Sequence, residues 1–126
     1  MSERYSAKII DSSRQLSVEE RIKFKDIGDA IKLDDVCEES PIIIPVEDYV
    51  VISVHNEKSD TKDYEKYLIL SSDGEKYVTG SQSFWSNFKD FVEELSTEGI
   101  TKFNLKVYKR DSANYKGKKF LTCSLA

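Results

Sequence analysis

One long segment of this chain repeats its apolar residues at helical spacing, and segments of alternating apolar and polar residues lie on both sides of it. The helical segment follows Gly80-Ser-Gln-Ser83 and stops before Gly99; its apolar stripe consists of Phe84, Phe88, Phe91, Val92 and Leu95. Such a stripe predicts an amphipathic helix. The alternating segments predict strands, because successive side chains of a strand point to opposite faces. We therefore expect a mainly β protein with one packed helix.

Six segments have the composition of strands. They are 31–37, 49–55, 64–71 and 76–79 before the helix, and 100–110 and 118–125 after it. Ser72-Asp-Gly-Glu75 is typical of a tight turn between two of them. Pro41 and Pro45 bracket three isoleucines, and two prolines so close exclude a central strand at that place.

The first 26 residues are expected to form a separate N-terminal part, with the main domain over residues 27–126. Residues 1–16 are polar apart from Ile9 and Ile10, and we expect a weakly ordered arm. Ser17 and Glu20 match a capping box, which predicts a short helix over residues 18–25.

The order of the predicted elements agrees with a known small barrel. A helix between the third and fourth strands of a five-stranded antiparallel barrel is the order of the OB-fold. A generic α+β sheet with one packed helix would give the same order. Periodicity therefore leaves both architectures open.

Composition excludes several other classes of protein. The 126 residues suit one domain, and they contain neither a run of about 18 apolar residues nor, at the N-terminus, the apolar stretch of a signal peptide. Cys37 and Cys123 do not make a disulfide framework, so we expect reduced thiols and a cytoplasmic protein. No cofactor motif or nucleophile relay is present. The acids Asp34, Asp35, Glu38 and Glu39 would suit a magnesium-dependent nuclease or a solvated turn.

The last quarter of the chain is basic, although the whole chain has a net charge of −4. Residues 101–126 hold seven Lys or Arg residues and one acid, Asp111. The same segment contains four aromatic rings. Cations that follow phosphates and rings that stack on bases are what single-stranded nucleic acid requires.

Strand parity divides these residues between two faces. Phe103, Leu105 and Val107 are expected to point into the core with Leu121, Cys123 and Leu125, which sets the register. The candidate nucleic-acid-binding residues are then Lys106, Tyr108, Arg110, Lys118, Lys119 and Phe120, with Tyr115 and Lys116 in the joining loop and Tyr67 and Tyr77 on the middle strands. The alternative is an ordinary exposed strand surface, because tyrosine favours strands and edge lysines prevent aggregation.

Three segments of the sequence resemble a known family. They are Ile27-Gly-Asp-Ala-Ile-Lys-Leu-Asp-Asp-Val36, the stretch Leu70-Ser-Ser-Asp-Gly-Glu-Lys-Tyr-Val-Thr-Gly-Ser81 with the helix after it, and Asn114-Tyr-Lys-Gly-Lys-Lys-Phe-Leu-Thr-Cys-Ser-Leu125. Their order and spacing resemble the small single-stranded-DNA-binding proteins of phages that infect Gram-positive bacteria. The resemblance implies an OB-fold, no catalysis and no cofactor, and binding of displaced strands during phage DNA replication or recombination. The chain differs from many single-strand binders in its ending, which is not an acidic tail.

These observations predict a sequence-independent single-stranded-DNA-binding protein without enzymatic activity. Replication or recombination proteins are possible partners, and the sequence leaves open whether the chain is a monomer or a dimer. The main alternative is a phage-encoded module that binds a host protein through its acidic half. Residues 1–60 hold 14 acids and eight bases, which makes mimicry of nucleic acid physically feasible.

Overall fold

The computed structural model describes residues 5–25, 30–56, 63–100, 102–111 and 119–126. In chain order the elements are β1 (Tyr5–Ser12), α1 (Val18–Lys25), β2 (Ile31–Lys32), α2 (Leu33–Val36), β3 (Ile42–Asn56), β4 (Asp63–Ser71), β5 (Lys76–Thr79), α3 (Gln82–Thr97), β6 (Phe103–Asp111) and β7 (Lys119–Leu125). The protein is therefore mainly β, as the alternating segments predicted. In this described part, no helix is long and apolar enough to cross a membrane.

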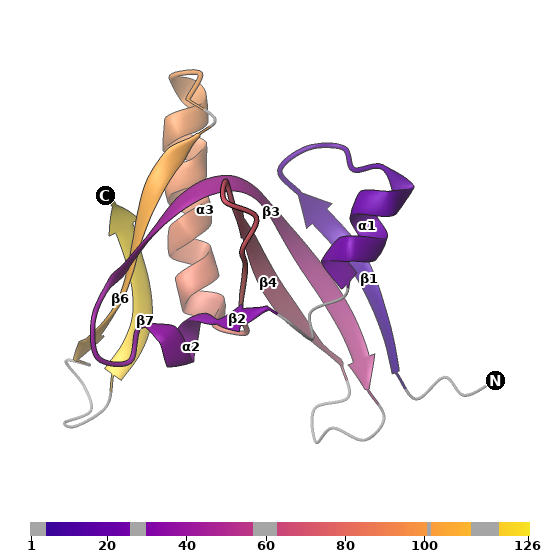
Figure 1. Cartoon of the computed structure of the whole chain (residues 1–126), viewed down its shortest axis with the longest axis horizontal. Helices are drawn as coiled ribbons and strands as arrows, with labels where there is room; N and C mark the ends of the chain where they lie inside the picture. The colour runs from indigo at the N-terminus through magenta and orange to yellow at the C-terminus, as the bar shows by residue number, and fades with distance from the viewer. Residues whose placement is uncertain (1–4, 26–29, 57–62, 101, 112–118) are drawn as a thin grey trace.

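The long strand β3 organises the sheet. The strand order is β2-β5-β4-β3-β6-β7, with β1 also paired to β3. Among the described strands, only β2 and β5 pair in parallel. The first part of β3, Ile42–Val46, pairs with β6, whereas Val50–Asn56 pairs with β1. β4 runs along the opposite edge of β3, with a register shift between Val46 and Asp48. Such a shift bends a strand, and the sheet curls into a half-barrel (Figure 1).

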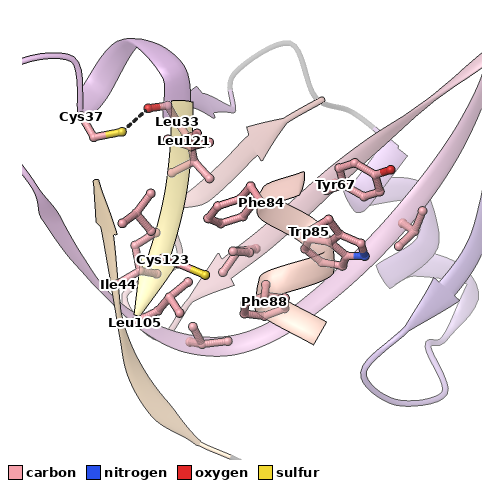
Figure 2. Close-up of a cluster of buried hydrophobic side chains, with 14 residues drawn as sticks. Leu33, Cys37, Ile44, Tyr67, Phe84, Trp85, Phe88, Leu105, Leu121 and Cys123 are labelled. Atoms are coloured by element: carbon pink, nitrogen blue, oxygen red, sulfur yellow. Dashed lines mark hydrogen bonds between the residues drawn. The ribbon is translucent and has the colours of Figure 1, made fainter. Parts of the chain in front are cut away.

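Helix α3 covers the concave face of this sheet. Its N-cap is Ser81, whose Oγ accepts a hydrogen bond from the Phe84 backbone N–H at 3.2 Å. Phe84, Trp85 and Phe88 are buried in one cluster with side chains of β3, β4, β6 and β7, as Figure 2 shows. The helix ends before Gly99, whose φ of +74° only glycine adopts readily. The predicted helix and both of its end signals are confirmed.

Helix α1 covers part of the other face. Phe24 and the preceding Leu16 pack on Val50, Ile52 and Leu68. The capping box is confirmed, because the backbone N–H of Ser17 donates to Glu20 Oε1 at 3.0 Å and that of Glu20 donates to Ser17 Oγ at 3.2 Å. The two helices thus cover opposite faces of the sheet.

The expectation of a weakly ordered N-terminal arm is wrong for residues 5–12. These residues form β1, which pairs with β3 from Tyr5 opposite Asn56 to Ser12 opposite Val50. Ala7 and Ile9 pack against the cluster under α1. The segment is polar because only one of its faces is covered, so its composition alone concealed the strand.

The predicted strand over residues 31–37 is also wrong beyond its first two residues. Ile31 and Lys32 form β2, and the chain then turns into the short helix α2. A strand would have placed Asp35 on the buried face. In the helix Asp35 is exposed, while Leu33 and Cys37 are buried.

The two prolines do not prevent a strand at Ile42–Ile44. Pro45 lies inside β3 and faces Asn104 of β6, and the pairing of β3 with β4 begins only at Val46. At Pro45 the strand is therefore paired on one side only. Proline has no backbone N–H, and no carbonyl of a described neighbouring strand lacks a donor because of it. The Pro45 carbonyl accepts from the Ser72 N–H at 2.8 Å.

Candidate nucleic-acid interface

The alternation predicted for the two C-terminal strands is confirmed with one exception. Leu105 and Val107 of β6 and Leu121 and Cys123 of β7 are buried on the side of α3. The exception is Leu125, which was expected to point inward and is 53% exposed, because it is the last residue of β7. Burial of Cys123 raises the pKa of its thiol to about 12.

The opposite side of β6 and β7 forms the candidate interface, which we call the outer face. It consists of Lys106, Tyr108 and Arg110 on β6 and Phe120, Thr122 and Ser124 on β7. In the register of the two strands Lys106 lies opposite Ser124, Tyr108 opposite Thr122, and Arg110 opposite Phe120. Each of the two rings therefore lies next to a cation on a neighbouring position of the pleated surface.

The outer face extends onto β3 through Ile43. This residue lies opposite Lys106 and is 53% exposed, while its neighbour Ile44 is completely buried on the side of α3. Sequence reasoning missed Ile43, because the flanking prolines were taken to exclude a strand. The run of three β-branched residues was the signal that could have indicated a strand here.

Two cations of the outer face are available to a ligand. Lys106 Nζ lies 5.3 Å from the centre of the Tyr108 ring, within the range of a cation–π contact. Among the described residues, neither Lys106 nor Arg110 forms an ion pair with an acid. The face therefore keeps its positive charge.

Other cations of the basic segment are already paired and point elsewhere. Lys102 forms an ion pair with Glu47, and Lys109 forms one with Glu38. Lys109 shares the parity of Leu105 and Val107, so it reaches Glu38 on the side away from Tyr108. Its hydrogen bond and charge lower the pKa of Glu38.

Lys119 is exposed, but it does not belong to the outer face. It lies opposite Asp111 at the end of the strand pair and has the parity of Leu121. Its charge adds to the effect of Lys109 in lowering the pKa of Glu38. Lys119 can thus contact a ligand only at the rim of the interface.

The expectation that Tyr67 presents an exposed ring is wrong. Its ring is stacked on Trp85 with centroids 4.9 Å apart and an angle of 12°, and the residue is only 4% exposed (Figure 2). Burial, together with a hydrogen bond from its hydroxyl to Glu65 Oε1 at 3.0 Å, raises the pKa of Tyr67 to about 12. Trp85 belongs to the same buried cluster.

Tyr77 is likewise not a free stacking platform. It is half-buried and packs against the cluster under α3. Both tyrosines alternate with leucine or valine along their strands. The prediction placed leucine and valine in the core, and therefore placed the tyrosines on the solvent-exposed face. That assignment failed because α3 covers the tyrosine face and α1 covers the other.

Three of the predicted site residues, Tyr115, Lys116 and Lys118, lie outside the described residues. Their predicted roles stay predictions. The described candidate site therefore consists of Lys106, Tyr108, Arg110 and Phe120, with Lys119 at its rim and Ile43 beside it.

Two of the four acidic residues considered for a metal site have other side-chain contacts. Asp34 Oδ2 accepts a hydrogen bond from Thr79 Oγ1 at 3.1 Å, and Glu38 is paired with Lys109. In the described ranges, no group of three or more His, Cys, Asp or Glu side chains is placed to hold a metal ion. The geometry of these acids gives no support to the nuclease alternative.

Comparison with protein-family models, with curated proteins and with solved structures finds no significant match to this chain. The site therefore has to be interpreted from its own geometry.

Proposed function

We propose that this protein binds single-stranded DNA, without sequence preference, across the outer face of β6 and β7. The observation that carries the proposal is the grouping of two rings, the exposed Phe120 and the partly exposed Tyr108, with two cations, Lys106 and Arg110, that form no ion pair with a described residue. All four lie on a sheet face that no described element covers. Bases would stack on the rings, and the cations would neutralise phosphates. Every base has a π-face, so stacking is tolerant of sequence.

The arrangement of the four side chains matches the needs of a single strand. Each cation lies beside a ring, so one nucleotide can present its base to the ring and its phosphate to the cation. Stacking contributes about 1–3 kcal/mol per base. Two stacked bases and two or three neutralised phosphates would give a dissociation constant in about the micromolar range at low salt.

We also propose that the half-barrel is a variant of the OB-fold. Five strands, β3 to β7, follow the expected chain order with α3 between β5 and β6, and β3 takes part in both halves of the sheet. The described strands leave the sheet open between β7 and the β2–β5 pair. There Asn87 Nδ2 of α3 donates to Cys123 O at 3.0 Å and to Thr122 Oγ1 at 3.1 Å. From the resemblance of three sequence segments to phage proteins, we propose that this binding serves phage DNA replication or recombination.

The direct test is a titration of labelled oligo-dT with the full chain. We expect binding at about 50 mM salt that weakens steeply by about 200 mM, because each phosphate contact on a single strand contributes about 0.7 to the slope of log K against log salt. Duplex DNA and RNA serve as competitors. Absence of binding up to about 100 μM at low salt would contradict the proposal, since even non-specific binders reach that affinity.

Two double variants each remove two positive charges. One removes them from the outer face, and the other removes two cations that do not belong to it. The variant Lys106→Ala with Arg110→Ala should lower the salt slope by about 1.4. The control, Lys102→Ala with Lys109→Ala, removes the cations that are paired with Glu47 and Glu38. Equal losses in both variants would show that net charge, rather than the outer face, determines binding.

A further inference from the structure

The two most exposed large apolar side chains of the described chain lie one turn apart on α1. Val18 is 61% exposed and Ile22 is 62% exposed. They form an apolar ridge on the side of α1 that faces away from Phe24, which is buried in the sheet. An exposed apolar patch with a charged border is typical of a protein contact site.

The ridge has a basic border. Arg21 and Lys25 lie on the same side of α1, and Lys8 of β1 lines the same shallow depression. None of these three cations forms an ion pair with an acid in the described ranges. The lining contains no aromatic ring on which a base could stack, so the patch suits a protein better than a single strand.

A complementary hollow lies beside α3. It has a volume of about 300 Å³, and Val92 of α3, Ile100 and Phe103 supply its apolar lining. Glu93 stands at its rim, and Asp90 lies three residues earlier on the exposed side of the same helix. Neither acid forms an ion pair with any described residue.

The ridge cannot reach the hollow of its own chain. α1 packs on one face of the sheet and α3 on the other, and Figure 1 shows the two helices well apart. The cation Lys89 in the lining of the hollow is paired with Asp11, and Glu93 keeps its charge, so the two surfaces have opposite charge. They can meet only between different copies. A contact between two different surfaces of identical copies is heterologous, and it continues into an open row unless the rotation closes a ring.

We infer that copies of this chain associate head to tail, with the Val18–Ile22 ridge of one copy in the hollow beside α3 of the next. Arg21 and Lys25 then face Asp90 and Glu93 across the contact. The inference goes beyond the proposed function and does not depend on it, because neither surface includes a residue of the outer face.

Sedimentation equilibrium without nucleic acid tests this association. At about 0.1 M salt we expect an average mass that exceeds the 14.5 kDa of one chain and rises with concentration beyond twice that value. At about 1 M salt the mass should fall, because the screening length drops from about 10 Å to about 3 Å. A mass of one chain at concentrations up to about 1 mM, or a mass that stops at a dimer, would overturn the inference.

Charge reversal makes the test specific for these two surfaces. One variant carries Arg21→Glu with Lys25→Glu, and the other carries Asp90→Lys with Glu93→Lys. Each alone has like charges on both surfaces and should stay monomeric, whereas an equal mixture should regain the mass of the unmodified protein. A mixture that stays monomeric would overturn the pairing of these surfaces.

Two further measurements separate the alternatives. The variant Val18→Ser with Ile22→Ser keeps every charge and should also lower the mass; circular dichroism and thermal unfolding verify that each variant folds. If the α1 charge variant instead loses affinity for a short oligonucleotide while the unmodified protein is monomeric throughout, the patch binds nucleic acid and the inference is wrong. Failure of oligonucleotide binding with association intact would affect only the proposed function.

Discussion

Lys106 and Lys109 lie three residues apart on β6 and have opposite surroundings. Lys106 lies beside the Tyr108 ring on the outer face, whereas Lys109 is paired with Glu38 on the other side of the strand. The period of two in a strand separates them, because odd and even positions project to different faces. A count of cations in this segment therefore overestimates the charge that a ligand on one face can meet.

The two rings of the outer face give the clearest prediction for single residues. Tyr108→Ala and Phe120→Ala should each weaken binding of oligo-dT by about 5-fold to 150-fold, which corresponds to the loss of one stacked base. Phe120 is 42% exposed, so its removal creates no cavity in the core. Fluorescence titration at fixed low salt measures the affinity, and thermal unfolding shows that the fold is kept.

Ile43→Ala is the matched control for the ring variants. This side chain lies on the same surface, next to Lys106, and has no ring. Its removal should change the affinity little. If Ile43→Ala weakens binding as much as the ring variants do, apolar area rather than stacking determines affinity.

At the scale of elements, a network of charged groups attaches α1 to the sheet. Arg14 Nε donates to Asp48 Oδ1 at 3.2 Å, and its guanidinium also pairs with Glu20 in the first turn of α1. Asp48 is buried on β3 and accepts a further hydrogen bond from Ser13 Oγ at 2.9 Å. Two hydrogen bonds lower the pKa of Glu20 from 4.5 to about 2. The larger effect comes from Arg14, and the next comes from the Ser17 N–H.

This shift predicts how stability depends on pH. Because the folded-state pKa is below the unfolded value, the contribution of Glu20 is complete above about pH 4.5 and is lost as the pH falls toward 2. The urea midpoint of the unmodified protein should therefore exceed that of Glu20→Gln by the largest margin near neutral pH, and the margin should shrink in acid.

Glu19→Gln is the control for this measurement. Glu19 is exposed on the same helical turn, and no ion pair with a described residue involves it. Its variant should show no comparable pH-dependent margin. A margin for Glu20→Gln that stays constant from about pH 6 to about pH 3 would show that Arg14 does not stabilise the carboxylate.

The sequence predicted those elements that carry their own local signals. The capping box of α1, the turn at Gly74 with its φ of +94° and the end of α3 before Gly99 are all decided by neighbouring residues. The strand β1 was missed because its stability comes from pairing with β3, some 40 residues away. The faces of Tyr67 and Tyr77 were misassigned for the same reason, since the covering helix lies elsewhere in the chain.

At the scale of the whole molecule, one sheet face has two different surroundings. α1 covers this face over β3 and β4, where Val50, Ile52 and Leu68 are buried. Over β6 and β7 the same face has no described cover, and there it carries the rings and the unpaired cations. A rigid sheet with α3 on its far side thus presents the outer face to solvent.

Photochemical cross-linking tests the central claim most directly, because it locates the strand on the protein. A short oligonucleotide containing 5-bromodeoxyuridine is irradiated with the full chain at low salt, and mass spectrometry identifies the modified residues. The proposal predicts adducts on Tyr108 or Phe120, which are lost when both are changed to alanine. Adducts confined to α1 or to other surfaces, or no adducts from a saturated complex, would contradict binding across the outer face of β6 and β7.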